Sequence, residues 1–235
     1  MAMSFTYEFP HPAVTVDFVI FGVDLSDPNP DLRVLLVQRA DEPFKGYFAL
    51  PGGFVNIDED LDDAAKRMLR ETTGIGPRFY MEQLRTFGAP DRDPRERVIT
   101  VAYLALVNIA GRKIMAVSDA DFVAWYPARW RARLAFDHRK ILDAAIERLE
   151  SKVRYAPVGF DLLPKKFTLG ELQRLYEVIL DRSLDTRNFR KRIAEMSILT
   201  PTGEKKPTGG RKAQLFSFDK AAYDSAIKRG FNFEV

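Results

Sequence analysis

Cysteine is absent from this chain of 235 residues, and histidine occurs only twice, as His11 and His138. Without cysteine there is no disulfide, no thiolate metal site and no cysteine nucleophile. Two histidines are also too few for a histidine-rich metal site. Any bound metal ion would therefore have to be held by carboxylates.

Long apolar runs are missing as well. The sequence has no stretch of roughly 18 consecutive apolar residues, which argues against a transmembrane helix. Its N-terminal segment lacks the basic stretch and apolar core of a signal peptide. We therefore expect a cytoplasmic protein with no membrane partner.

The charge is unevenly divided along the chain, although the net charge is only +3. Residues 160–235 contain 15 Lys and Arg against 10 Asp and Glu, a formal +5, which leaves −2 for residues 1–159. A basic terminal module on a nearly neutral body is typical of a nucleic-acid contact surface, or simply of a solvated face.

Hydrophobic patterning predicts a first domain, residues 1–155, in which strands and helices alternate. Ala13–Val23, Leu32–Arg39 and Arg97–Val107 have strand character, and the first two bracket a turn-rich segment. Leu61–Thr73 and Asp137–Val153 have apolar residues at helical spacing, and Asp137 is a candidate N-cap. This pattern indicates an α/β or α+β fold.

A break at residues 155–159 predicts a second, mostly helical domain, residues 156–235. Thr168 and Glu171 form a capping-box sequence before a helix that extends to about Leu180. Asp185 or Thr186 can cap a second helix, residues 187–196. Two short strands, residues 198–200 and 214–218, enclose a Lys/Arg/Gly-rich tip, and Asp219 begins a short helix that Gly230 ends.

The segment after Pro51 resembles the Nudix motif, in which a glycine and a glutamate precede the run Arg-Glu-apolar-any-Glu-Glu-any-Gly-apolar. The spacing matches without a gap, after an approach of Leu50-Pro51-Gly52-Gly53 that is also similar to the family. The matching residues are Gly53, Glu59, Arg67, Leu69, Glu71, Gly74 and Ile75. The resemblance implies a Nudix-like domain with a mixed sheet between helices.

Two of the three glutamates that hold divalent cations in the Nudix family are replaced here. Positions 68, 71 and 72 lie on one helix face, where three carboxylates could grip one hard cation. This chain has Met68, Glu71 and Thr72, and neither a thioether nor a neutral hydroxyl supplies the missing charge. We expect no catalytic residues, weak or absent hydrolysis and no required cofactor. Glu71 is either a residual ligand for Mg²⁺ or a partner of Arg67.

A nucleotide pocket can survive the loss of metal ligands. Guanidinium groups grip diphosphates and an aromatic ring can stack on adenine. The ligand-binding candidates are Arg39, Phe44, Gly52, Gly53, Glu71, Arg92, Arg95, Arg97 and His138. Gly52 and Gly53 are also typical of a tight turn. His138 has a structural alternative, and each arginine can equally be a solvated surface residue.

The C-terminal pattern is that of a winged helix-turn-helix domain, whose second helix enters the major groove of DNA. Arg187, Arg190 and Lys191 share one stripe of this helix, flanked by Asn188 and Arg192. These residues are suited to reading bases, and the wing residues Lys205, Lys206, Arg211 and Lys212 to binding phosphates. The alternative is a solvated charged helix on a domain that binds another protein.

Together the two halves resemble the Nudix-related transcriptional regulators of NAD metabolism, the NrtR family. The resemblance implies a homodimer on palindromic double-stranded operator DNA that represses genes of NAD synthesis or salvage. It also implies that ADP-ribose is the effector that releases the DNA. The alternative is an active Nudix pyrophosphatase that hydrolyses ADP-ribose or a related dinucleotide.

Overall fold

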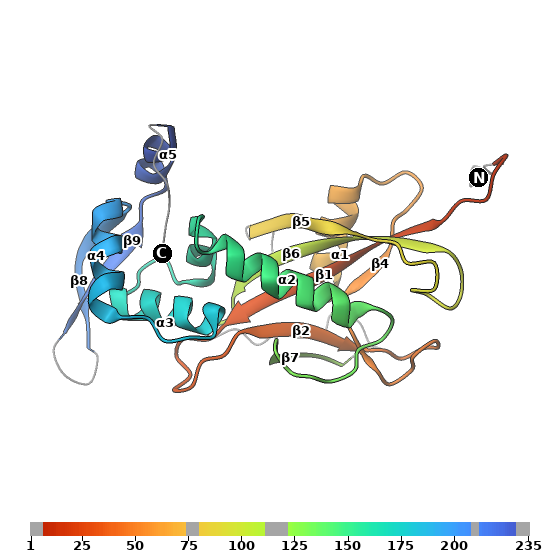
Figure 1. The fold of residues 1–235 in the computed structure, drawn as a ribbon, viewed down its shortest axis with the longest axis horizontal. Coiled ribbons are helices and arrows are strands. Elements are labelled where there is room, and N and C mark those ends of the chain that lie inside the picture. The colour runs from red at the N-terminus through yellow and green to blue at the C-terminus, as the bar shows by residue number, and fades with distance from the viewer. Residues whose placement is uncertain (1–6, 74–79, 111–121, 208–211, 229–235) are drawn as a thin grey trace.

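The computed structural model describes residues 7–73, 80–110, 122–207 and 212–228. A seven-stranded mixed sheet forms the body of the molecule, and a two-stranded sheet lies in the C-terminal module (Figure 1). None of the helices in these ranges is both long and apolar enough to span a bilayer.

Two long strands form the centre of the large sheet. β1 (Ala13–Val23) pairs in parallel with β6 (Val98–Asn108) over their whole length, and β5 (Tyr80–Phe87) is antiparallel to β6. On the other side, β2 (Arg33–Gln38) is antiparallel to β1 and pairs with β3 (Phe48–Ala49) and β7 (Val123–Pro127). The short β4 (Gly52–Phe54) is antiparallel to the first half of β1.

The sheet is covered on both faces, which explains the nearly continuous apolar sequences of β1 and β6. Alternate residues of β1 enter different cores because successive side chains of a strand point to opposite faces. Phe18 and Ile20 pack with α1 (Leu61–Thr73), whereas Val19 and Phe21 lie in the core of α2 (His138–Lys152). The predicted α/β character and mixed sheet are confirmed.

Two strands that the sequence pattern does not predict, β5 and β7, are present. β5 has one fully buried side chain, Leu84, and a register shift between Gln83 and Arg85, so its polarity does not alternate. β7 has only five residues and no fully buried side chain. Both segments become strands because they pair with β6 and β2, a tertiary effect that local periodicity does not record.

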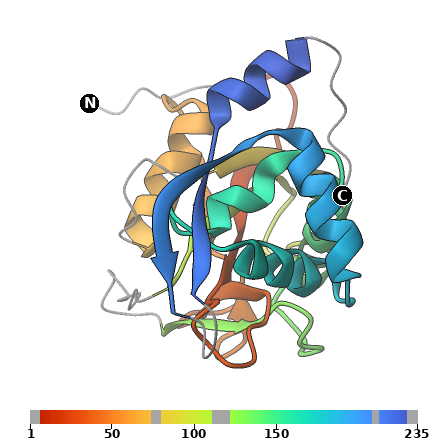
Figure 2. The same cartoon turned by 90° about the vertical axis from the view of Figure 1, so that its left-hand side faces the viewer.

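The C-terminal module begins with a 3-10 helix, η1 (Pro157–Leu162), followed by α3 (Leu169–Leu180) and α4 (Thr186–Met196). Strands β8 (Leu199–Lys206) and β9 (Ala213–Phe218) form a hairpin, and α5 (Lys220–Lys228) follows. Figure 2 views this end of the molecule, where α3 contacts both α4 and β9. The predicted winged helix-turn-helix is confirmed.

Local capping signals predicted the starts of α3, α4 and α5 correctly. The Glu171 amide donates to Thr168 Oγ1 at 3.1 Å, and the Thr168 amide donates to Glu171 Oε2 at 2.7 Å. Asp185, rather than Thr186, caps α4, and Asp219 accepts from the Ala222 amide at the start of α5. Gly230, the predicted end of that helix, lies outside the described residues.

Strand β8 is longer than predicted, because the pairing with β9 resumes at Lys205 after an irregularity that begins at Pro201. The segment predicted as the boundary between the two domains, residues 155–159, leads directly into η1, whose Val158 and Phe160 are buried. These side chains belong to one apolar core that continues from the large sheet and α2 into α3 and α4.

Candidate functional site

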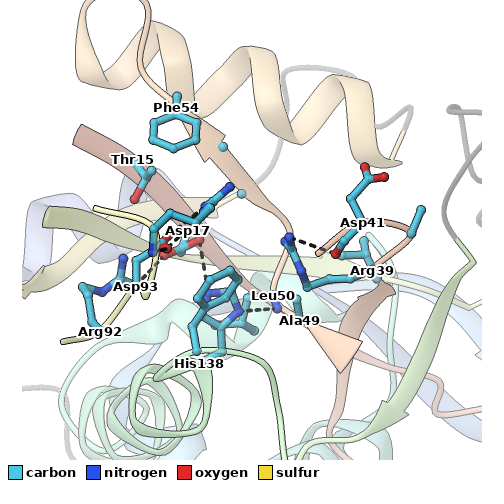
Figure 3. Close-up of a pocket in the computed structure, with 16 residues that line it drawn as sticks. Thr15, Asp17, Arg39, Asp41, Ala49, Leu50, Phe54, Arg92, Asp93 and His138 are labelled. Carbon is cyan, nitrogen blue, oxygen red and sulfur yellow. Dashed lines mark hydrogen bonds and ion pairs between the residues drawn. The ribbon is translucent and has the colours of Figure 1, made fainter. Parts of the chain in front are cut away.

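A cavity of about 290 Å³ opens beside the first half of β1 (Figure 3). Its walls come from β1, the loop after β2, the segment around β4, the loop before β6, and the start of α2. The floor is built from buried polar side chains, and the rim from arginines and aromatic rings.

A buried guanidinium lies in the floor of this cavity. The Arg92 side chain is only 3% exposed, and its Nη2 lies 2.8 Å from Asp137 Oδ1 and 3.3 Å from Asp17 Oδ2. Arg92 Nε also donates to Asp137 Oδ2 at 3.2 Å. Burying this cation requires counter-charges, and here two carboxylates share it.

This pairing corrects one prediction. Asp137 occupies the N-cap position of α2, but its side chain makes no capping hydrogen bond. Its carboxylate binds Arg92 instead, because a fully buried guanidinium is a stronger partner than a helix-start amide. The start of α2 is therefore fixed by a contact to a loop 45 residues away in sequence.

His138 has a structural partner in the same floor. The Leu50 amide donates to His138 Nδ1 at 2.9 Å, and His138 Nε2 lies 3.7 Å from Asp17 Oδ1. Burial lowers the pKa of His138, outweighing the opposite effect of Asp17. The ring is accordingly neutral, with Nδ1 as acceptor and the proton on Nε2. This contact holds the backbone that enters strand β4. The tight turn predicted for Gly52 and Gly53 is wrong, because both residues lie in β4, pair with β1 and have no positive φ.

The neutral His138 predicts an acid-sensitive fold. Because its folded pKa lies below the unfolded value of about 6.5, its contribution to stability is present above that pH and is lost as the pH falls. We expect the free energy of unfolding to decrease below about pH 6.5, by up to about 1.4 kcal/mol per pH unit. Denaturant titrations at about pH 7.5 and about pH 5.5 measure this dependence.

The control is His138→Asn, whose amide oxygen can still accept from the Leu50 amide but does not titrate in this range. Its stability should change less between the two pH values than that of the wild type. Equal slopes for the two proteins would contradict the assignment. The other histidine, His11, is exposed.

The rim combines two cations with two aromatic rings. The Arg95 guanidinium carbon lies 5.5 Å from the Phe54 ring centroid and 5.7 Å from that of Phe136, and the Arg39 carbon lies 4.8 Å from Phe136. Asp93 binds Arg95 at 2.7 Å. Burial raises the pKa of Asp93, but its bonds to Arg95 outweigh burial and lower it. The rim can therefore bind an anion and stack on a planar ring.

Six of the predicted ligand-binding residues line the cavity: Arg39, Gly52, Gly53, Arg92, Arg95 and His138. Phe44, Arg97 and Glu71 do not. Phe44 packs edge-on against Phe136 at 4.9 Å, and Arg97 donates to the backbone oxygens of Ala89 and Val98.

Ten lining residues were not predicted, and those with polar or aromatic side chains are Thr15, Asp17, Asp41, Phe54, Asp93 and Phe136. Thr15 and Asp17 are polar residues in an otherwise apolar strand, and that interruption was the available signal. Phe136 has a positive φ of 52°, a rare backbone conformation that local sequence does not indicate.

The face of α1 that carries metal ligands in Nudix proteins has different partners here. Arg67 forms a bidentate pair with Glu59, with both nitrogen–oxygen distances at 2.7 Å, and contacts Glu71 at 3.3 Å. The expected Arg67–Glu71 contact is confirmed, but Glu59 is the closer partner. These bonds raise the pKa of Arg67 further above its usual value.

Met68 lies next to Gly53 of strand β4. A Cβ on Gly53 would lie 2.6 Å from Met68 Cε, and Met68 Sδ lies 3.1 Å from an Arg67 nitrogen. The Met68 thioether and the Arg67 guanidinium thus lie where a hard cation would need oxygen ligands. In the described ranges no group of three His, Cys, Asp or Glu residues can hold a metal ion. These residues do not fit Mg²⁺. The Thr72 side chain, Gly74 and Ile75 lie outside the description.

A basic surface lies on α4. Phe189, Ile193 and Met196 are buried against the module's core, whereas the opposite face is exposed. The exposed residues include all five predicted there: Arg187, Asn188, Arg190, Lys191 and Arg192. Lys191 has only a loose contact to Glu195, at 3.9 Å.

The hairpin β8–β9 adds further cations. Lys205 and Lys212 are exposed, and Lys206 binds Glu171 at 2.6 Å, which fixes the hairpin to the start of α3. Arg211 lies outside the described residues. The exposed cations of α4 and the hairpin have the pattern of groove-reading and phosphate-binding residues.

Comparison with known families divides the chain in the same way. Residues 14–145 match the NUDIX domain, and residues 159–218 match the NrtR DNA-binding winged helix domain. Over 226 residues the chain is 39% identical to the ADPR responsive transcriptional repressor NtrR of Acinetobacter baylyi, covering 94% of this chain and 88% of that protein.

Two solved structures extend the similarity. Shewanella oneidensis NrtR complexed with a 27mer DNA is 37% identical, with a TM-score of 0.78 over 94% of this chain and 97% of that one. The NUDIX domain of that protein complexed with ADP ribose is 38% identical, with a TM-score of 0.52 over 60% of this chain and 90% of that one. The chain therefore belongs to the NrtR family, in which a Nudix domain precedes a winged helix domain.

Proposed function

We propose that this chain is a transcriptional repressor whose Nudix domain, residues 1–155, binds ADP-ribose and whose winged helix domain, residues 156–235, binds operator DNA. One observation carries the proposal. A cavity with cationic and aromatic walls lies beside a Nudix helix that lacks two of its three metal-binding carboxylates, and the same chain exposes the arginine face of α4.

The relatives support both halves of this function. The Acinetobacter relative is named for its response to ADPR, and the Shewanella relative was solved with DNA and, as an isolated Nudix domain, with ADP ribose. The proposal includes a homodimer on a palindromic site, control of genes of NAD synthesis or salvage, and a cytoplasmic location.

The rim of the cavity suits the charge and shape of the ligand. Arg39 and Arg95 can bind the diphosphate, because the Arg95 side chain, although paired with Asp93, is 41% exposed. Phe54 and Phe136 offer faces for a planar base. Arg92 has a different role, because Asp17 and Asp137 already neutralise it. It shapes the floor of the cavity rather than gripping phosphate.

The direct test is a gel-shift titration of the full chain on the DNA upstream of its own gene and on promoters of NAD-metabolism genes. We expect a retarded complex that ADP-ribose dissociates and that adenosine at the same concentration does not. Retardation that ADP-ribose leaves unchanged would contradict its role as effector, and absence of retardation on every duplex would contradict the DNA-binding function.

DNA binding should depend strongly on salt. Four cations were assigned to the wing, Lys205, Lys206, Arg211 and Lys212, and each phosphate contact contributes about −0.9 to the slope of log affinity against log salt. We therefore expect a slope near −4 per subunit. Fluorescence anisotropy from about 50 to about 200 mM salt measures it. A salt-insensitive complex would contradict the phosphate contacts.

We expect no hydrolysis of ADP-ribose above the uncatalysed background with either Mg²⁺ or Mn²⁺. The reason is that Met68 and the Arg67–Glu59 pair occupy the region where oxygen ligands would hold the cation. Product formation can be followed by chromatography of AMP. Turnover that Glu71→Gln abolishes would instead establish the alternative function, a Nudix pyrophosphatase.

A further inference from the structure

A single arginine of the Nudix domain holds the C-terminal end of α3. Arg129 follows β7, and its Nη2 donates to Ile179 O at 2.7 Å and to Glu150 Oε1 at 2.8 Å. Its Nη1 donates to Val178 O at 3.4 Å, and its Nε lies 3.5 Å from Asp181 Oδ2. The last carbonyls of a helix lack helical partners and carry negative partial charge, so a guanidinium is a suitable cap.

The end of α3 determines where α4 begins, because only residues 181–185 separate the two helices. Asp181 takes a left-handed conformation there, with φ of 51° and ψ of 42°. The Leu184 amide donates to Glu177 Oε1 at 2.9 Å, so the turn is hydrogen-bonded back to α3. A shift of α3 at its C-terminal end must therefore move the start of the DNA-contact helix.

The other end of the Arg129 segment reaches the cavity. Residues 128–137 connect β7 to α2, and this segment also carries Phe136 and Asp137. Phe136 lines the cavity, and Asp137 holds Arg92 in its floor. Glu150, the α2 partner of Arg129, lies on the helix whose first residue, His138, lines the cavity (Figure 3). The cavity and α3 are thus connected through residues 128–137 and through α2.

We propose that Arg129 is the positioning residue that couples the ligand cavity to α4. It holds α3 in one arrangement relative to the Nudix domain, and occupation of the cavity changes the stability of that arrangement through Phe136, Asp137 and α2. A ligand shifts such an equilibrium only by its differential affinity for the two arrangements. This inference rests on the proposed function, since it assumes that ADP-ribose and DNA bind the same chain.

The test compares a coupling ratio, the dissociation constant for DNA with saturating ADP-ribose divided by that without it. Wild-type full-length protein should give a ratio of at least about 5 on a duplex that it retards. Arg129→Gln should bring the ratio to within about twofold of 1, while calorimetry without DNA shows ADP-ribose affinity within about threefold of wild type. A purely structural role would change the affinities but leave the ratio intact.

The matched control is Arg139→Gln. Arg139 lies on α2 and donates to Trp130 O in the same segment at 2.6 Å and to Asp143 on its own helix, and among the described residues it makes no hydrogen bond to α3. Arg139→Gln should keep the wild-type coupling ratio. If Arg129→Gln does not fold, Glu150→Gln is the second test. It removes the carboxylate that accepts from Arg129 on α2, and it should also lower the coupling ratio.

Each outcome has a definite meaning. A folded Arg129→Gln protein with the wild-type ratio overturns the coupling role, and so does Glu150→Gln with that ratio if Arg129→Gln is unfolded. An equal fall in the Arg139→Gln ratio also overturns the specific role of Arg129. A wild-type ratio of 1 would instead refute the proposed effector function, which the wild-type measurement tests separately.

Discussion

Replacing Arg92 by methionine is expected to lower the free energy of unfolding by about 3–5 kcal/mol, the largest stability effect among these predictions. The guanidinium is buried between Asp17 and Asp137, whose side chains are 8% and 9% exposed. Removing it leaves two buried carboxylates without a counter-charge, and the cost of that desolvation exceeds the value of the lost contacts themselves. Urea denaturation monitored by tryptophan fluorescence measures the change.

Arg97→Met is the matched control, because Arg97 is exposed and, within the described part of the chain, its side chain donates to two backbone oxygens and to no carboxylate. Its effect should be about 1 kcal/mol or less. Adding Asp17→Asn and Asp137→Asn to the Arg92→Met variant should recover part of the loss, because the uncompensated charges are then gone. A loss of less than about 1 kcal/mol for Arg92→Met would contradict the buried charge network.

Replacing Arg187 and Arg190 together by alanine is expected to weaken DNA binding by roughly 100-fold or more. Both side chains are exposed on the face of α4 opposite its buried Phe189 and Ile193, and nothing in the described structure pairs them with a carboxylate. A bidentate arginine contact to a guanine edge contributes about 1–3 kcal/mol, so two such contacts account for this loss. Fluorescence anisotropy on the retarded duplex measures the affinity.

Arg70→Ala controls for the loss of positive charge, since Arg70 is an exposed arginine in the last turn of α1. It should leave DNA affinity within about twofold of wild type. The double variant should retain its ADP-ribose affinity, because both replaced residues lie on α4 and not in the cavity. Wild-type DNA binding by the double variant would contradict base reading by these two arginines. Absence of any DNA retardation, with the double variant behaving like the wild type, would favour the alternative in which the winged helix binds a protein.

Local signals in the sequence were sufficient where the interaction spans a few residues. The capping box of Thr168 and Glu171 and the cap at Asp185 depend on groups three positions apart, so the start of α3 and the capped start of α4 could be predicted. The amphipathic face of α4 was equally clear, because Phe189, Ile193 and Met196 recur at helical spacing.

The cavity was predicted only in part, because its members come from distant segments. The sequence directed attention to the arginines of residues 92–97, but it does not show that Arg92 meets Asp17, 75 residues earlier, and Asp137, 45 residues later. Arg92 therefore changes from a candidate phosphate ligand to the centre of a buried charge network. Conversely, Arg97 faces a loop backbone, and Phe136 replaces Phe44 at the cavity wall.

The sequence by itself determined the family, the order of the two modules, the starts of α3 and α4 and the loss of carboxylates at Met68 and Thr72, because these depend on residue identity at short spacing. Only the tertiary structure decided which charges are neutralised, which aromatic rings line the cavity, and that Arg129 caps α3 from the Nudix domain. These features depend on strand pairing and packing between distant segments. An arginine side chain can be solvated, buried in an ion pair or bonded to two elements at once, and the groups that the fold places beside it decide which.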